Sequence, residues 1–124
     1  MTWGEWLLVV AAGAVGAPLR YVVDTLVSDR SGGTFPLGTL VVNLTGSFAL
    51  GVLTGLVLYH GVGQAPRLVA GTGLLGAYTT FSTFSLETVS LAESGEIGLA
   101  LRNVAASVFA GTLAAAAGWS LAGL

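Results

Sequence analysis

The segment between Gly76 and Glu87 places many hydrogen-bonding side chains in the middle of a long apolar stretch. It reads Gly-Ala-Tyr-Thr-Thr-Phe-Ser-Thr-Phe-Ser-Leu-Glu and contains five hydroxyl groups, a phenol and a carboxylate. Hydroxyl groups can donate hydrogen bonds to a bound ion, and the edge of an aromatic ring carries the positive part of its quadrupole. A helix surrounded by lipid would not carry this set, so the segment is a candidate site inside the protein.

The composition of the whole chain indicates that this segment lies in a membrane protein. Of 124 residues, 54% are hydrophobic and 8% are charged, and the mean hydropathy is +0.87. A soluble domain carries about 25% charged residues, which excludes a soluble monomer. Four spans of about 20 apolar residues each would use most of the chain. We therefore predict an all-α integral membrane protein with four transmembrane helices in a single domain, residues 1–124.

Several classes of function are excluded by residue types that the chain lacks. It has no cysteine and one histidine, His60, which excludes disulfides, iron–sulfur clusters and zinc sites. Its four basic residues are all arginine and its formal net charge is −2, so it lacks the basic stripe that nucleic-acid binding requires. No enzyme site is visible in the sequence.

Prolines, glycines and polar residues mark the ends of the four predicted helices. Trp3 and Trp6 suit an aromatic anchor at the membrane interface, and this acidic start lacks the basic residues of a signal peptide. Pro36 suits the first position of a helix, and Pro66 opens the next helical segment. The predicted helices are residues 3–27, 36–59, 66–93 and 95–121.

The third predicted helix is expected to break near the membrane midplane, at residues 77–81. At 1.5 Å per residue, Thr79 lies about 20 Å from Pro66, well inside a bilayer about 30 Å thick. Glycine followed by two backbone-bonding threonines predicts half-helices of residues 66–77 and 82–93 with unwound backbone between them. The alternative is a continuous helix whose serine and threonine hydroxyls bond to preceding carbonyls.

Small residues recur four positions apart on three of the predicted helices, and we call these rows small-residue ridges. Such ridges let helices approach closely. Most serve packing within one chain or face lipid, but we also expect them to join two oppositely oriented copies of the chain. They comprise Ala12 and Gly16, Gly13 and Ala17, Gly51 and Gly55, and Ser107, Gly111 and Ala115.

Three ordered motifs run through the chain. They are residues 13–21, Gly-Ala-Val-Gly-Ala-Pro-Leu-Arg-Tyr, residues 38–48, Gly-Thr-Leu-Val-Val-Asn-Leu-Thr-Gly-Ser-Phe, and residues 73–87, which include Thr-Thr-Phe-Ser-Thr-Phe. Together they resemble the small microbial fluoride channel family, Fluc. The resemblance implies an antiparallel, dual-topology homodimer in the cell membrane, with two fluoride pathways and a central structural sodium ion. The implied function is passive export of fluoride from the cytoplasm.

Asn43 has two competing interpretations. It lies about 10 Å along the second predicted helix and shares a face with Ser47, one turn later. A buried amide needs a partner, and from the residues alone an interhelical hydrogen bond is the favoured explanation. The resemblance instead assigns Asn43 to the fluoride pathway.

The pathway implied by the resemblance is centred on two phenylalanines, Phe81 and Phe84. Their spacing puts them on one helical face, where in isolation they would be ordinary packing residues. In the family the matching phenylalanines line the ion path from opposing subunits, with the threonine matching Thr80 as a hydroxyl donor beside them. Thr83 and Ser107 are further candidate donors.

The resemblance also gives roles to one arginine and two backbone carbonyls. Arg20 either reaches the lipid headgroups or forms a positive vestibule that attracts anions. The carbonyls of Gly76 and Thr79 are the implied ligands of the sodium ion, an oxygen set that suits a hard cation. Glu87 could bond polar backbone or form a proton-coupled site.

Three residues depart from the family pattern, namely Tyr78, Asn103 and Gly111. The main alternative function is a small proton-coupled multidrug transporter of the four-helix, dual-topology type. That mechanism needs an acid deep in the first helix, where this chain has Glu5 and Asp24 only near the ends. A non-transporting assembly subunit would explain the small-residue ridges but not the buried polar cluster. The few arginines give a weak charge bias between loops, so both membrane orientations are expected.

Overall fold

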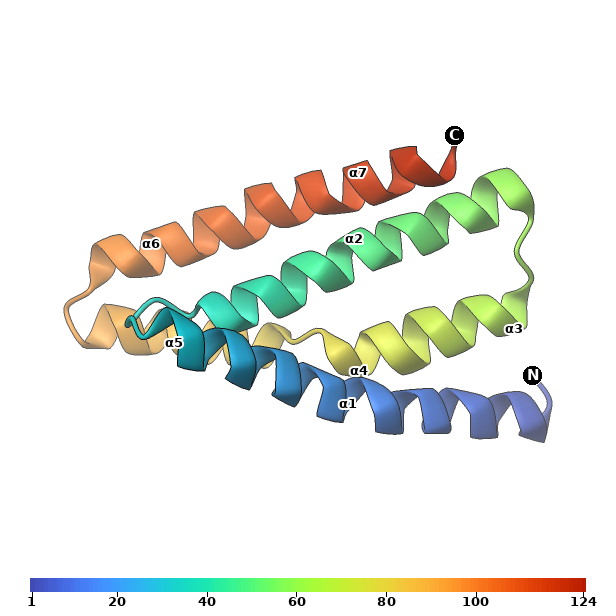
Figure 1. Cartoon of the computed structure of the whole chain (residues 1–124), viewed down its shortest axis with the longest axis horizontal. Coiled ribbons are helices and arrows are strands. Elements are labelled where there is room, and N and C mark those ends of the chain that lie inside the picture. The colour runs from blue at the N-terminus through green and yellow to red at the C-terminus, as the bar shows by residue number, and fades with distance from the viewer.

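A computed structural model describes residues 1–124 and shows four helical passes in which neighbours in sequence run in opposite directions (Figure 1). The prediction of an all-helical protein with four helical passes is confirmed. The first two passes are α1, Trp3–Ser31, and α2, Leu37–His60. The third comprises α3 (Gln64–Arg67), the π-helical segment η1 (Leu68–Leu75), α4 (Gly76–Tyr78) and α5 (Phe81–Glu93). The fourth comprises α6 (Ile97–Ala105), the π-helical segment η2 (Ala106–Ala110) and α7 (Gly111–Ala122).

The first pass is longer than predicted, ending at Ser31 and not at Val27. Its start is fixed by a reciprocal cap, in which the Glu5 amide donates to Thr2 Oγ1 at 3.2 Å and the Thr2 amide donates to Glu5 Oε2 at 2.6 Å. The polar residues 28–31 remain helical because none of them is a glycine or a proline. Gly32, with φ of +62°, ends it.

Three helices are long and apolar enough to cross a membrane, namely Trp3–Ser31, Leu37–His60 and Ile97–Ala122. The third pass is divided between Tyr78 and Phe81, so neither of its parts reaches that length. Thr79 and Thr80 lie between the parts with extended backbone, at ψ of 160° and 125°. Three helices of this length and composition indicate a multi-pass membrane protein.

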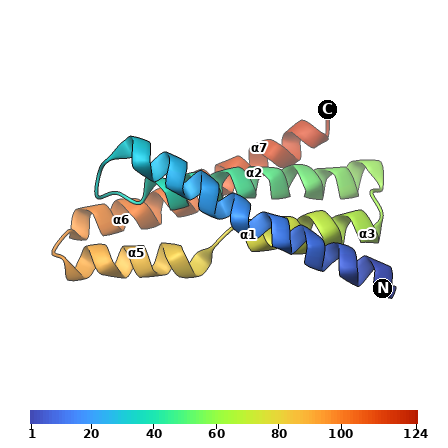
Figure 2. The same ribbon diagram turned by 60° about the horizontal axis from the view of Figure 1, so that its bottom comes forward.

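The second and fourth passes lie side by side in both views, and α1 crosses the other helices obliquely (Figure 2). Glycines allow these close approaches. A Cβ on Gly51 would overlap the carbonyl oxygen of Ala115, and one on Gly118 would overlap that of Phe48. Helix α1 packs on the third pass in the same way, because a Cβ on Gly16 would overlap the carbonyl oxygen of Leu74.

These contacts correct the expectation about the small-residue ridges for three of their glycines. We expected the ridges to join two copies of the chain, but Gly16, Gly51 and Gly55 are buried against other helices of the same chain. A face that is already filled by backbone within one chain cannot also receive a second copy. Any contact between copies must therefore lie away from these three glycines.

Replacing Gly51 by alanine tests the close packing of α2 on α7. The added methyl group must push the Ala115 carbonyl away, so we expect Gly51→Ala to lower the free energy of unfolding by about 1–3 kcal/mol. Thermal unfolding in detergent measures this. Gly98→Ala is the control, because a Cβ there meets nothing within 4 Å. Equal melting temperatures for the two variants would contradict the packing.

Candidate ion-binding groove

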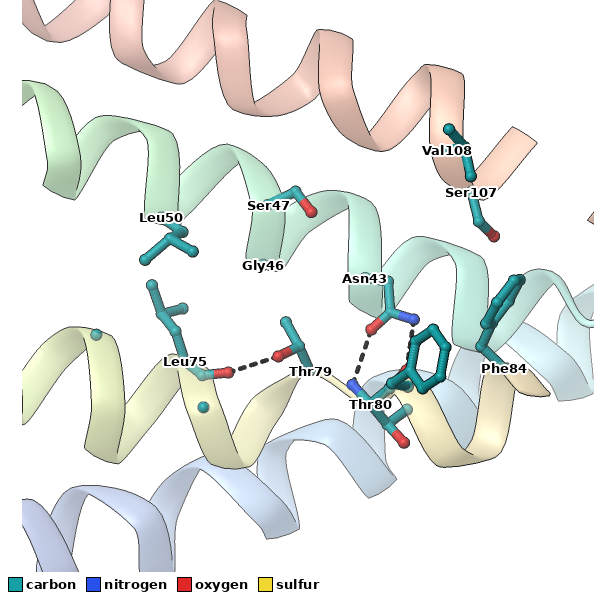
Figure 3. A pocket seen from close by; sticks show the side chains of 13 residues that line it. Asn43, Gly46, Ser47, Leu50, Leu75, Thr79, Thr80, Phe84, Ser107 and Val108 are labelled. Carbon is teal, nitrogen blue, oxygen red and sulfur yellow. Dashed lines mark hydrogen bonds between the residues drawn. The ribbon is translucent and has the colours of Figure 1, made fainter. Parts of the chain in front are cut away.

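A groove of about 400 Å³ lies where α2, the third pass and the middle of the fourth pass, at η2, meet (Figure 3). It brings together most of the residues that the sequence singled out, and it leaves out Thr83 and Arg20. No lining residue carries an ionisable side chain. The predicted residues in the lining are Asn43, Gly76, Thr79, Thr80, Phe81, Phe84 and Ser107, and the others are Gly46, Ser47, Leu50, Gly71, Leu75 and Val108.

Asn43 holds the extended backbone at the centre of the groove. Its Nδ2 donates to the Thr80 carbonyl at 2.8 Å, and its Oδ1 accepts from the Thr80 amide at 2.9 Å (Figure 3). One side chain thus satisfies both backbone groups of a residue that has left the helix. This is the interhelical hydrogen bond favoured from the residues alone. One amide hydrogen of Nδ2 is left over, so the bond is compatible with a place in an ion path.

Thr80 also starts the following helix. Its Oγ1 accepts from the Thr83 amide at 3.2 Å, as a residue preceding a helix commonly does, and it donates to Thr83 Oγ1 at 3.0 Å. The Thr83 hydroxyl is therefore engaged with Thr80 and does not line the groove. Its predicted role as a pathway donor stays a prediction.

The interruption of the helix frees the carbonyl of Gly76 from its usual donor, because the Thr80 amide bonds to Asn43 instead. The Thr79 carbonyl accepts from Arg20 Nη1 at 3.2 Å. Arg20 thus lies beside the break, half-buried, and α1 continues past it to Ser31. Its place in a vestibule stays a prediction.

The two phenylalanines lie together at the start of α5 and both line the groove. Their ring centroids are 5.7 Å apart, and the ring planes are tilted by 50°. The Phe81 side chain is 78% exposed in the single chain. An aromatic ring so open in the middle of a membrane pass is available to a partner or to an ion.

Two serine hydroxyls face the groove without a bond to another groove residue, Ser47 on α2 and Ser107 on η2 (Figure 3). Ser107 was predicted as a donor. Ser47 was placed on the same face as Asn43 but was not assigned to the pathway. Its spacing of one helical turn from Asn43 was the signal that could have identified it.

Glu87 and Asn103 lie outside the groove. One carboxylate oxygen of Glu87 accepts from Thr39 Oγ1 at 2.8 Å, and the other is buried without a partner. Asn103 is 2% exposed and donates to Thr88 Oγ1 at 2.9 Å, which joins α6 to α5. Asn103 therefore does not continue the row of groove hydroxyls beyond Ser107.

Comparison with known proteins identifies the family. Residues 7–119 match the family described as CrcB-like protein, Camphor Resistance (CrcB). The chain belongs to this family. A protein of Streptomyces avermitilis named "Fluoride-specific ion channel FluC 1" is 50% identical over 114 residues, which cover 92% of each chain.

Relatives of similar name occur in other bacteria. "Fluoride-specific ion channel FluC 2" of Mycolicibacterium paratuberculosis is 49% identical over 99% of this chain and 98% of its own length. "Fluoride-specific ion channel FluC" of Rhizobium meliloti is 46% identical over 93% of each chain. Every groove residue lies within the part of the chain that matches the CrcB-like family.

Replacing Asn43 by alanine tests its hold on the break. The Thr80 amide and carbonyl would lose their partners, so we expect amide hydrogen exchange in residues 78–83 to accelerate by about tenfold. Mass spectrometry of peptides covering this segment measures the rate. Ser47→Ala, one turn along the same face, is the matched control. Unchanged exchange in Asn43→Ala would show that the two bonds do not hold the break.

Proposed function

We propose that this protein is a fluoride-selective ion channel that lets fluoride leave the cytoplasm passively across the cell membrane and so limits its toxicity. The names of its relatives support this function, because the alignments with them cover at least 92% of each chain. The observation that carries it is the chemistry of the groove, which offers hydroxyl and amide donors and aromatic ring edges but no ionisable side chain. As a channel, the protein is not an enzyme.

A neutral groove suits an anion that must bind and then leave. The Ser47 and Ser107 hydroxyls and the remaining amide hydrogen of Asn43 replace part of the water around fluoride. The ring edges of Phe81 and Phe84 add weak positive charge. A buried arginine or lysine in the same place would hold the ion too tightly for rapid departure.

The neutral groove also separates this function from proton-coupled multidrug transport. Such a transporter needs an acid that gains and loses a proton where the substrate binds, whereas Glu87 lies outside the groove. Fluoride enters a cell from acid surroundings as hydrogen fluoride and dissociates inside. A negative membrane potential then favours exit of the anion by about 2.3 kcal/mol per charge per 100 mV. Export needs no pump.

Substitution of the phenylalanines tests this function. Ile retains apolar bulk but has no positive ring edge, so Phe81→Ile and Phe84→Ile should each fold and reduce fluoride efflux from proteoliposomes by about tenfold. Phe109→Ile is the control, because Phe109 is 70% exposed and does not line the groove. Efflux that is unchanged in both variants, or wild-type efflux of fluoride no faster than that of chloride, would refute the proposal.

The channel is proposed to be an antiparallel homodimer. The groove is open on one side, and its hydroxyls and the exposed Phe81 ring would otherwise face lipid. Polar groups in hydrocarbon are unfavourable unless a protein partner or a water-filled path receives them. A second copy placed over the groove would supply that partner and would enclose the ion path. The weak arginine bias favours insertion in both orientations.

Cysteine labelling tests the dual topology. The chain has no cysteine, so Ser31→Cys at one end and Gly63→Cys at the other each introduce one unique label site. We expect a membrane-impermeant reagent to label about half of each variant in intact vesicles, and the remainder after permeabilisation. Complete labelling of one variant with no labelling of the other would instead show a single orientation.

A structural sodium ion is proposed at the dimer centre. The freed Gly76 carbonyl and the second lone pair of the Thr79 carbonyl fit a hard cation, although the Arg20 charge beside Thr79 opposes it. Two carbonyls are too few to replace a hydration shell, so both copies must contribute. When bound, the ion would join the two breaks and take no part in transport.

Exchange of the cation tests this site. We expect the melting temperature in detergent to be higher in sodium chloride than in potassium chloride at equal ionic strength, because a bound ion stabilises the folded dimer. The comparison uses purified protein from which sodium has been dialysed. Equal melting temperatures in the two salts would remove the sodium site from the proposal.

A further inference from the structure

Tyr78 places a phenol group at the end of α4, immediately before the extended residues of the third pass. The side chain is 8% exposed, and its hydroxyl lies 2.8 Å from Thr45 Oγ1 on α2. The sequence had marked Tyr78 only as a departure from the family pattern. In the structure it makes a side-chain bond between the broken pass and α2, which gives this departure a physical role.

The direction of this bond is fixed by the other contacts of Thr45. Thr45 Oγ1 lies 2.7 Å from the Val41 carbonyl and 3.0 Å from the Val42 carbonyl, and both carbonyls can only accept. A hydroxyl has one hydrogen, which Thr45 therefore gives to its own helix. Tyr78 must be the donor and Thr45 the acceptor. Without Thr45 the phenol would be a buried donor with no partner.

This bond complements the two hydrogen bonds that Asn43 makes on the opposite side of the same break. Asn43 forms hydrogen bonds with the backbone of Thr80, where the chain enters α5. Thr45 accepts a hydrogen bond from the hydroxyl of Tyr78, where the chain leaves α4. Between them, Gly46 provides the space that the Thr79 side chain occupies, since a Cβ there would overlap it. Three residues from neighbouring positions of α2 thus fix three consecutive residues of the break.

We propose that Tyr78 is a positioning residue for ion conduction in this protein. By donating to Thr45 it fixes where α4 ends, and it thereby sets the position of the adjoining Thr79 and Thr80 in the groove wall. The inference rests on the proposed function, since the groove is where fluoride would pass. The bond itself can be tested without any measurement of flux.

A double-mutant cycle tests the inference with Tyr78→Phe, Thr45→Val and the combination. Tyr78→Phe removes donor and bond together and should lower the fluoride-to-chloride permeability ratio by about threefold. Thr45→Val leaves the buried phenol unpaired and should lower it by about tenfold. The combination should recover to the value for Tyr78→Phe, because no donor then lacks an acceptor. Melting temperatures should follow the same order.

Tyr21→Phe is the matched control, because Tyr21 is 71% exposed and should change neither quantity. Additive effects in the cycle would show that the two hydroxyls do not act together. A coupled change in melting temperature with an unchanged permeability ratio would reduce Tyr78 to a purely stabilising residue and overturn the positioning role. Failure of the unsubstituted protein to carry fluoride would overturn the proposed function, and it is distinguishable because the melting-temperature cycle does not depend on flux.

Discussion

The structure depends on how two extended residues in the middle of a membrane pass satisfy their backbone groups. In hydrocarbon each unpaired amide or carbonyl costs several kcal/mol, so a helix cannot open there without replacement partners. The Thr79 amide still bonds to the Leu75 carbonyl, and Arg20 donates to the Thr79 carbonyl. Asn43 takes both backbone groups of Thr80. Side chains from α1 and α2 therefore make the interruption of the third pass stable.

These replacement hydrogen bonds also determine which groups the groove presents to an ion. Because Asn43 is held at the break, the next turn of α2 brings the Ser47 hydroxyl to the groove, and η2 brings Ser107 to the other wall. Phe81 and Phe84 begin α5 directly after the break, so its position fixes where their rings lie. Donors and ring edges thus meet in a site whose lining side chains carry no formal charge. Such a site can bind an anion without the strong retention that a buried cation would produce.

Much of the fold could be predicted from local patterns, because apolar runs and prolines define the four passes. The predicted end of α1 was four residues too early, because polar residues continue a helix until a residue such as Gly32 ends it. Contacts between helices were harder to predict. Spacing placed Asn43 and Ser47 on one face but could not show that Asn43 would bond to backbone 37 residues away. Nor could it show that Gly51 packs within the chain and not against a second copy.

Passive conduction through a neutral groove is tested most directly by the reversal potential of the current through the purified protein in a planar bilayer. The two sides should hold different fluoride concentrations in otherwise matched salts. If no ionisable side chain takes part, the current should reverse at the equilibrium potential of fluoride. That potential should then stay the same when a pH difference is imposed at fixed fluoride ion concentrations. A reversal potential that shifts with the pH difference would show coupled proton movement and would contradict a channel of this kind.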